Sequence, residues 1–139
     1  MNAILMVLVS VIASASTYFV SHNLKQGPVK ASAILSFIVA LLFALLFHNA
    51  KANYLIMNIP LVFIGASFVG MSSKTHLKNL MYAAFAGLLF GFIFLSTADL
   101  FKGYGGGLGT KASLSVLVTL GIEYLIVGAI EKVNRIFNK

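Results

Sequence analysis

Apolar residues dominate the chain in five long runs, which are separated by short links that contain most of the charge. The runs are Ala3 to Val20, Ala31 to Phe47, Tyr54 to Met71, Leu80 to Leu95 and Leu114 to Ile130. Each has 16 to 18 residues, close to the lower limit for a helix that crosses a hydrocarbon core of about 30 Å. None alternates at period two, so a β-barrel is not predicted. The pattern predicts an all-α transmembrane bundle of five spans that forms one domain over residues 1–139.

The third run differs from the others because Asn58 and Pro60 interrupt its first third. Proline removes a backbone donor and kinks or breaks a helix interior. Four spans with Tyr54 to Met71 as a re-entrant segment are therefore the alternative to five. In either case, small residues spaced four apart let neighbouring helices pack closely. The candidate packing positions are Ser36, Ala40, Gly87 and Gly91.

Composition excludes a soluble fold. Hydrophobic residues make up 60% of the chain and charged residues 9%, whereas soluble domains carry about 25% charged residues. The chain has no cysteine, which excludes thiolate metal sites and thiol catalysis. The formal net charge is +7, but the basic residues lie almost entirely in the links, where they set membrane orientation. We therefore expect the lipid bilayer as a partner, and not nucleic acid.

Five spans would divide the basic residues unequally between the two membrane sides. Seven lie on one side and three on the other: Lys25, Lys30, Lys74, Lys78, Lys132, Arg135 and Lys139 against Lys51, Lys102 and Lys111. Cytoplasmic links carry the excess of basic residues in membrane proteins. For a bacterial-type inner membrane, this split predicts an N-terminus outside and a C-terminus inside.

The last run contains a single carboxylate, Glu123, at its tenth position. An ionisable group near the bilayer midplane costs roughly 2.5–3.5 kcal/mol on insertion scales and usually faces a bundle interior or a wet cavity. Polar residues recur at every fourth position upstream of it, which places them on one helix face: Lys111, Ser115 and Thr119. We expect this face to line an ion or solute pathway. Glu123 would then be its coupling or selectivity residue.

A protonated Glu123 that only makes a structural contact is the other interpretation of the same pattern. Its candidate partners carry amide or hydroxyl groups and lie on other runs or on the run of Glu123 itself: Asn58, Ser10, Ser14, Ser36 and Thr119. Asn58 is included in the predicted pathway for this reason.

A Lys-Ala-Ser sequence occurs twice, at Lys30 to Ser32 and at Lys111 to Ser113, each after a glycine-containing turn. With five spans, the two copies lie on opposite sides of the membrane, as an inverted repeat would place them. A lysine and hydroxyl groups at a helix N-terminus also form a candidate anion site. Its residues are Lys30 and Ser32 in one copy, and Thr110 and Ser113 beside Lys111 in the other. Helix capping and interfacial lysines explain the same residues without a ligand.

These patterns predict a small membrane channel or transporter for an ion or small polar solute. Five short helices barely enclose a pathway, so a homodimer is expected, with Gly87 and Gly91 at its seam. The alternative is a non-transporting structural or accessory subunit of a larger membrane assembly, with a membrane protein as partner. An enzyme is not expected, because neither a Ser-His-acid order nor a Glu-x-x-His pair occurs. No metal or cofactor is predicted.

Overall fold

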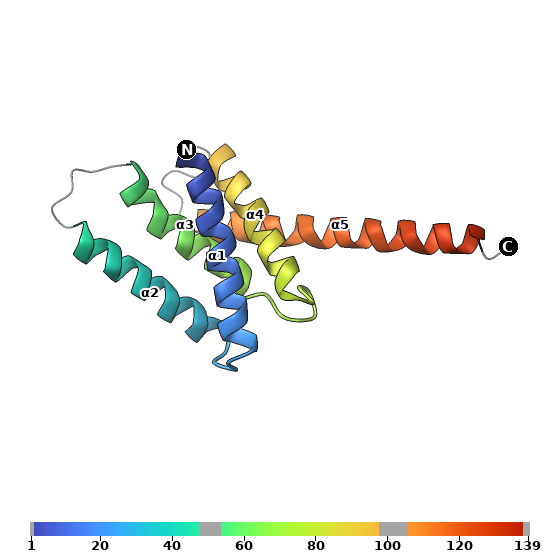
Figure 1. Ribbon diagram of the computed structural model, residues 1–139, viewed down its shortest axis with the longest axis horizontal. Helices are drawn as coiled ribbons and strands as arrows, with labels where there is room; N and C mark the ends of the chain where they lie inside the picture. Colours follow the sequence, from blue (N-terminus) through green and yellow to red (C-terminus); the bar gives the residue numbers. More distant parts are fainter. Residues whose placement is uncertain (1, 48–53, 98–105, 138–139) are drawn as a thin grey trace.

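All regular elements in the described part of the chain are α-helices (Figure 1). The computed structural model of the protein describes residues 2–47, 54–97 and 106–137, with side chains as far as residue 130. Its helices follow the five apolar runs closely, except that the last begins earlier and continues further than its run. They are α1 (Asn2–His22), α2 (Pro28–Leu46), α3 (Tyr54–Gly70), α4 (Leu80–Ser96) and α5 (Gly107–Phe137). The predicted all-α fold is confirmed.

Helix α1 lies at the centre of the bundle, in contact with α2, α3 and α4. One of its faces carries small side chains at three- and four-residue spacing, which allows neighbouring backbones to approach closely. The members of this face are all buried: Ser10, Ala13, Ser14, Thr17 and Ser21. The central position of α1 therefore follows from a narrow, small-residue face on an otherwise apolar helix.

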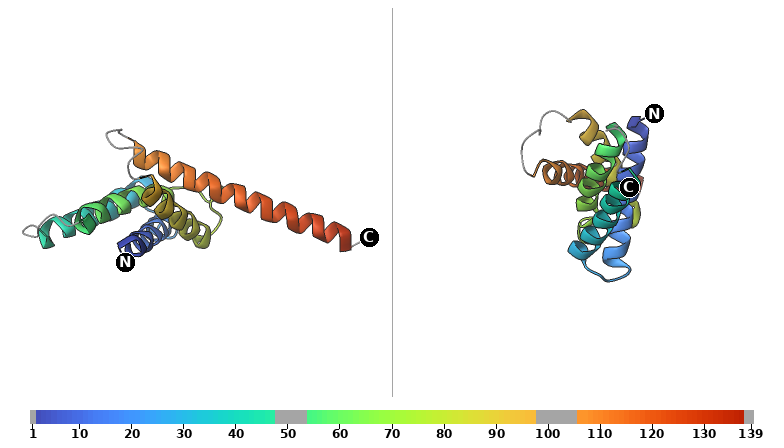
Figure 2. Two further views of the ribbon diagram at one scale, coloured as in Figure 1. Left: turned by 90° about the horizontal axis from the view of Figure 1, so that it is seen from above. Right: turned by 90° about the vertical axis from the view of Figure 1, so that its left-hand side faces the viewer.

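Helix α5 begins against α3 and α4 and then leaves the bundle, so that its second half projects away from the other helices (Figure 1). It also crosses α1 steeply, since α1 stands upright in the view of Figure 2 in which α5 is seen end-on. In this arrangement α1 and α5 do not follow one common membrane normal.

Within the described ranges, three helices are long and apolar enough to cross a membrane, namely α1, α2 and the segment Gly107–Ile130 of α5. This supports association with a membrane. Helices α3 and α4 have 17 residues each, which gives a length of about 25 Å and falls short of a typical hydrocarbon core. Pro60 lies inside α3, which continues through it. The count of five spans and the re-entrant alternative both stay predictions.

The two glycines of the predicted dimer seam face α1 of the same chain. A Cβ atom at Gly87 would lie 2.7 Å from the Cβ of Ser14, and one at Gly91 would lie 2.5 Å from the hydroxyl oxygen of Ser10. The Ser10 hydroxyl can rotate away, but the Cα atom of Val7 would lie 3.0 Å from a Cβ at Gly91, and the carbonyl oxygen of Ser10 would lie 2.8 Å from one at Gly87. These backbone atoms of α1 leave little room for a side chain at either position. The seam therefore holds α1 and α4 together within one chain, and a second copy would have to contact another surface.

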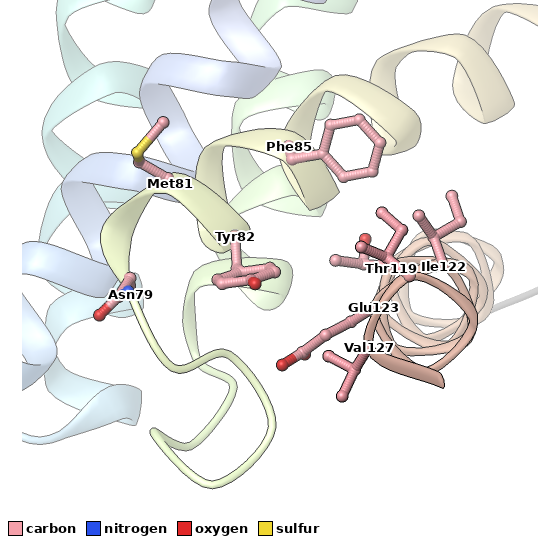
Figure 3. Close-up of a pocket in the computed structure, with 9 residues that line it drawn as sticks. Asn79, Met81, Tyr82, Phe85, Thr119, Ile122, Glu123 and Val127 are labelled. Carbon is pink, nitrogen blue, oxygen red and sulfur yellow. The ribbon is translucent and has the colours of Figure 1, made fainter. Parts of the chain in front are cut away.

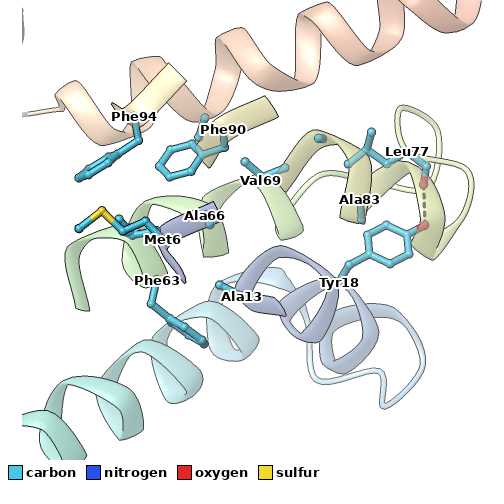
Figure 4. Packing of buried hydrophobic residues seen from close by; sticks show 13 residues of the cluster. Met6, Ala13, Tyr18, Phe63, Ala66, Val69, Leu77, Ala83, Phe90 and Phe94 are labelled. Carbon is cyan, nitrogen blue, oxygen red and sulfur yellow. Dashed lines mark hydrogen bonds between the residues drawn. The ribbon is translucent and has the colours of Figure 1, made fainter. Parts of the chain in front are cut away.

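Hydrogen bonds between helices supplement this close packing. The Ser14 hydroxyl on α1 donates to the carbonyl of Ala83 on α4 at 2.7 Å. One turn further along α1, the Tyr18 hydroxyl donates to the carbonyl of Leu77, which precedes α4 (Figure 4). Buried polar groups need such partners, because an unpaired one costs about 1–3 kcal/mol. The first bond joins α1 to α4, and the second joins α1 to the link 71–79 between α3 and α4.

Helix α2 is held to α3 by a cluster of three hydroxyl groups. Ser67 of α3 lies 2.7 Å from the hydroxyl of Ser32 and 3.2 Å from that of Ser36. Ser67 also donates to its own helix, at the carbonyl of Ile64. Ser36 and Ala40, two predicted packing positions, are half-buried and line a shallow groove beside α3.

The two Lys-Ala-Ser sequences occupy different positions in their helices. Lys30 lies in the first turn of α2, whereas Lys111 lies in the second turn of α5, which begins at Gly107. Their surroundings differ as well, since Lys30 is exposed and Lys111 is 5% exposed. The early start of α5 follows Gly106, whose φ of 92° suits glycine. The inverted repeat stays a prediction.

Candidate functional site

The polar face of α5 is turned towards the bundle. Lys111, Ser115 and Thr119 are all buried, while apolar residues cover the opposite face of the same helix. The Ser115 hydroxyl donates to the carbonyl of Ala112, and the Thr119 hydroxyl donates to the carbonyl of Ser115. Both hydroxyl groups therefore bind carbonyl groups of their own helix and are buried. The next polar residue on this face is Glu123.

Glu123 lies at the point where α5 separates from the bundle. Its side chain is 10% exposed, and its Oε1 atom lies 2.6 Å from the Nζ atom of Lys78. Lys78 comes from the link 71–79, and its own side chain is 63% exposed. The hydrogen bond to Glu123, together with the charge of that carboxylate, raises the pKa of Lys78 above its ordinary value of 10.5. The acid thus receives its counter-ion from a long, solvent-accessible side chain on another element.

A groove of about 500 Å³ lies between α4 and α5, and Glu123 lines it. Figure 3 shows the Glu123 side chain directed from α5 towards α4, on the side where Tyr82 lies. Thr119 and Ile122 contribute the α5 wall above the acid (Figure 3). The full lining is Asn79, Met81, Tyr82, Phe85, Thr119, Ile122, Glu123, Ile126 and Val127.

The sequence placed Glu123 differently from the structure in two respects. The partner of its carboxylate is a lysine, not one of the amide or hydroxyl groups proposed from the sequence. The acid is also the seventeenth residue of the 24-residue candidate span Gly107–Ile130, so it is displaced from the middle of that span. Both differences arise because α5 begins earlier than its apolar run and because the link 71–79 folds towards it.

Of the predicted pathway residues, Ser115 does not line the groove, and Asn58 and Lys111 lie far from it. Asn58 donates to the carbonyl of Tyr54 in its own helix, and it is about 18 Å from the end of α3 that adjoins the link 71–79. Lys111 is separated from Glu123 by three turns of α5, again about 18 Å. Its Nζ atom lies 4.8 Å from the centre of the Phe94 ring, an arrangement in which a cation is attracted by the ring face.

The predicted anion-site residues are distributed over two separate helix starts. Lys30 is exposed, and Ser32 is buried against Ser67. At α5, Thr110 donates to the carbonyl of Gly106 and Ser113 donates to that of Thr110. These hydroxyl groups therefore all interact with protein atoms. Free backbone N–H groups occur only in the first turn of a helix. The second Lys-Ala-Ser sequence begins at Lys111, after the first turn of α5.

Sequence reasoning missed Lys78 and the aromatic residues Tyr82 and Phe85. Lys78 was interpreted only as a topological charge, although a basic residue directly before a helix is a candidate counter-ion for any buried acid. Comparisons with protein-family models, curated proteins and solved structures found no match. Fold and site together define a small all-helical protein with candidate membrane spans. Its groove is lined mostly by apolar side chains and has the ion pair of Glu123 and Lys78 at its edge.

Proposed function

We propose that the protein is a small membrane transporter or channel for a cation, in which Glu123 is the coupling or selectivity residue. The observation that supports this most is the pair of Glu123 and Lys78 at 2.6 Å, at the edge of the groove between α4 and α5. An acid in an apolar span needs a cationic partner, because an uncompensated charge there is expensive. Here the partner is Lys78, which a cation from solution can replace.

The replaceability of Lys78 follows from its position. Its side chain is 63% exposed and belongs to a link, not to a helix. Water and salt reach the ammonium of this exposed side chain and screen its attraction to Glu123, and a long side chain loses entropy when it is fixed. A solute cation that enters the groove competes with the ammonium for the same carboxylate. Binding and release at Glu123 then alternate between Lys78 and the solute, which is the exchange that a coupling residue performs.

The arrangement of the links supports the predicted orientation. Asn23, at the end of α1, and Lys74 and Lys78 of the link 71–79 line one small pocket, so two links that contain basic residues meet at one end of the bundle. The first residues of α1 lie at the opposite end (Figure 1). We propose that the lysine-bearing end faces the cytoplasm of a bacterial-type cell and that the N-terminus lies outside its inner membrane.

Flux through purified protein in liposomes tests this function. Protons, sodium and potassium are each driven by a concentration gradient, and their movement is followed with pH-sensitive or ion-sensitive dyes. We expect flux of at least one cation with the natural protein and its loss in Glu123→Gln, which keeps the size of the side chain. Glu131→Gln removes another carboxylate of α5 and is the matched control. Equal flux of every tested ion in the natural protein and Glu123→Gln would overturn the proposal.

The exposed second half of α5 favours a second candidate function, that of an accessory subunit. Several large apolar side chains there are not covered by any of the residues that the structure describes, among them Tyr124 at 81% and Leu125 at 71% exposure. Lipid or another protein covers such a surface. A photocrosslinking residue in place of Leu125, tested in native membranes, shows what covers this surface. An adduct with a different membrane protein supports the accessory role, and an adduct of twice the chain mass supports a homodimer. Adducts with lipid alone contradict both the accessory role and the homodimer.

A further inference from the structure

We infer that the groove between α4 and α5 binds an organic cation with hydrophobic substituents, whose charge replaces the Lys78 ammonium at Glu123. The inference rests on the proposed function and narrows its substrate class. Two features carry it: the composition of the groove wall, and the position of a lysine that already occupies the cation position.

The wall of the groove matches hydrocarbon surface better than a hydrated metal ion. Tyr82 and Phe85 contribute aromatic rings from α4, and Ile122 and Ile126 contribute aliphatic side chains from α5. Metal ions such as calcium need six or more oxygen ligands, whereas this wall has few polar groups besides the Glu123 carboxylate. Aromatic rings attract cations through their faces, and carboxylate supplies the opposite charge. A cation that carries apolar groups satisfies all of these surfaces at once.

The size of the groove agrees with such a ligand. Its volume of about 500 Å³ falls within the range of roughly 300–1,000 Å³ that is typical for small-molecule sites. Figure 3 shows Tyr82, Phe85 and Glu123 around the same space, with the two rings on α4 and the acid on α5. A ligand there would contact both helices, and its charge would lie at the end of the groove nearest to the link 71–79.

Lys78 is the internal competitor of this ligand. Its ammonium lies 2.6 Å from the Glu123 carboxylate, in the position that the charge of the ligand would take. Removal of the lysine charge should therefore strengthen binding of an organic cation, because the acid loses its alternative partner. Lys74 belongs to the same link and is also exposed, so its removal changes the net charge equally without freeing Glu123.

Equilibrium dialysis of the purified full-length protein against radiolabelled tetraphenylphosphonium in a non-ionic detergent tests the inference. We expect saturable binding, a loss of affinity of roughly tenfold or more in Glu123→Gln, and a gain in Lys78→Met that Lys74→Met does not show. Phe85→Leu should weaken binding several-fold and provides a second variant if Glu123→Gln does not fold. Neutral triphenylphosphine oxide has similar rings without charge, and its weak binding should not respond to Glu123→Gln.

Three results would overturn the inference: no saturable binding, equal affinity in folded Glu123→Gln, or an equal gain in both lysine variants. The dialysis measures binding without transport, so its outcome is separable from the flux assay. Binding of tetraphenylphosphonium without flux of any cation would contradict the proposed transport and support the groove as a binding site. Flux of small ions that depends on Glu123, without such binding, would support the transport function and contradict the organic substrate class.

Discussion

Replacement of Gly87 by alanine tests the close contact between α1 and α4, on which the whole bundle depends. An added Cβ at this position would lie 2.7 Å from the Cβ of Ser14 and 2.8 Å from the carbonyl oxygen of Ser10. One of these atoms belongs to the backbone of α1, so a side-chain rotation does not relieve the contact. The two helices must move apart, and the packing and hydrogen bond around Ser14 weaken together.

The size of this effect follows from two opposing terms. Alanine is preferred over glycine in a helix interior by roughly 0.8–1.0 kcal/mol, whereas overpacking of a tight contact costs typically about 1–3 kcal/mol. Gly121 on α5 is a matched control, because a Cβ there meets nothing within 4 Å. Both variants gain the helix preference, so their difference isolates the packing term. We expect Gly87→Ala to be about 1–3 kcal/mol less stable than Gly121→Ala.

Unfolding in mixed micelles with increasing dodecyl sulfate, followed by far-ultraviolet circular dichroism, measures this difference. A single transition that agrees between two probes is needed before free energies are compared. Equal stability of Gly87→Ala and Gly121→Ala, or a more stable Gly87→Ala, would show that α1 and α4 are not in the described contact.

Three further variants test individual contacts by the same unfolding assay. Ser14→Ala removes the 2.7 Å bond to the carbonyl of Ala83 and should cost about 0.5–1.5 kcal/mol; no change would mean that this bond is absent. Ser67→Ala removes the hydroxyl shared between α2 and α3 and should destabilise by a similar amount, which an unchanged transition would contradict. Lys78 has a raised pKa because of Glu123, so its contribution is complete below pH 10.5 and declines as pH rises through the raised value. Lys78→Met should be less stable than the natural protein at pH 8, and a difference that persists undiminished at pH 12 would refute the pairing.

Much of the fold could be predicted from the sequence, because long apolar runs form helices whether or not their neighbours are known. The same applies to Gly87 and Gly91, whose spacing indicates a close helix contact. The identity of the contacting helix could not be predicted, since small-residue faces occur on several runs and any two of them are compatible. Only the structure shows that α1 provides the partner surface.

The start of α5 was less predictable. Five glycines between Gly103 and Gly109 indicate a turn, because glycine disfavours helix interiors. Helix α5 nevertheless begins at Gly107, where Gly107 is buried and Leu108 packs against the core. Tertiary packing outweighs the local preference at this point, and a pattern within one segment does not contain that information.

The candidate site was predicted in part. The four-residue spacing from Lys111 to Glu123 correctly indicated one polar face, and the burial of that face follows from its need for protein neighbours. The partner of Glu123 depends on the path of the link 71–79, which is far from α5 in the sequence. Long-range pairing of this kind is fixed by the packing of α4 on both α1 and α5, so neither Lys78 nor the groove could be derived from local spacing.

The central claim is that the link 71–79 brings Lys78 to Glu123 beside the groove, because both proposals depend on this pair. The chain has no cysteine, so Lys78→Cys with Glu123→Cys can be crosslinked in intact membranes by a short bismaleimide without background. Lys78→Cys with Thr110→Cys is the control, since Thr110 lies about 20 Å further along α5. Mass spectrometry of the digested protein should find the bridge from position 78 to position 123 in high yield and little or none to position 110. A bridge to position 110 instead, or equal yields from the two pairs, would contradict the claim.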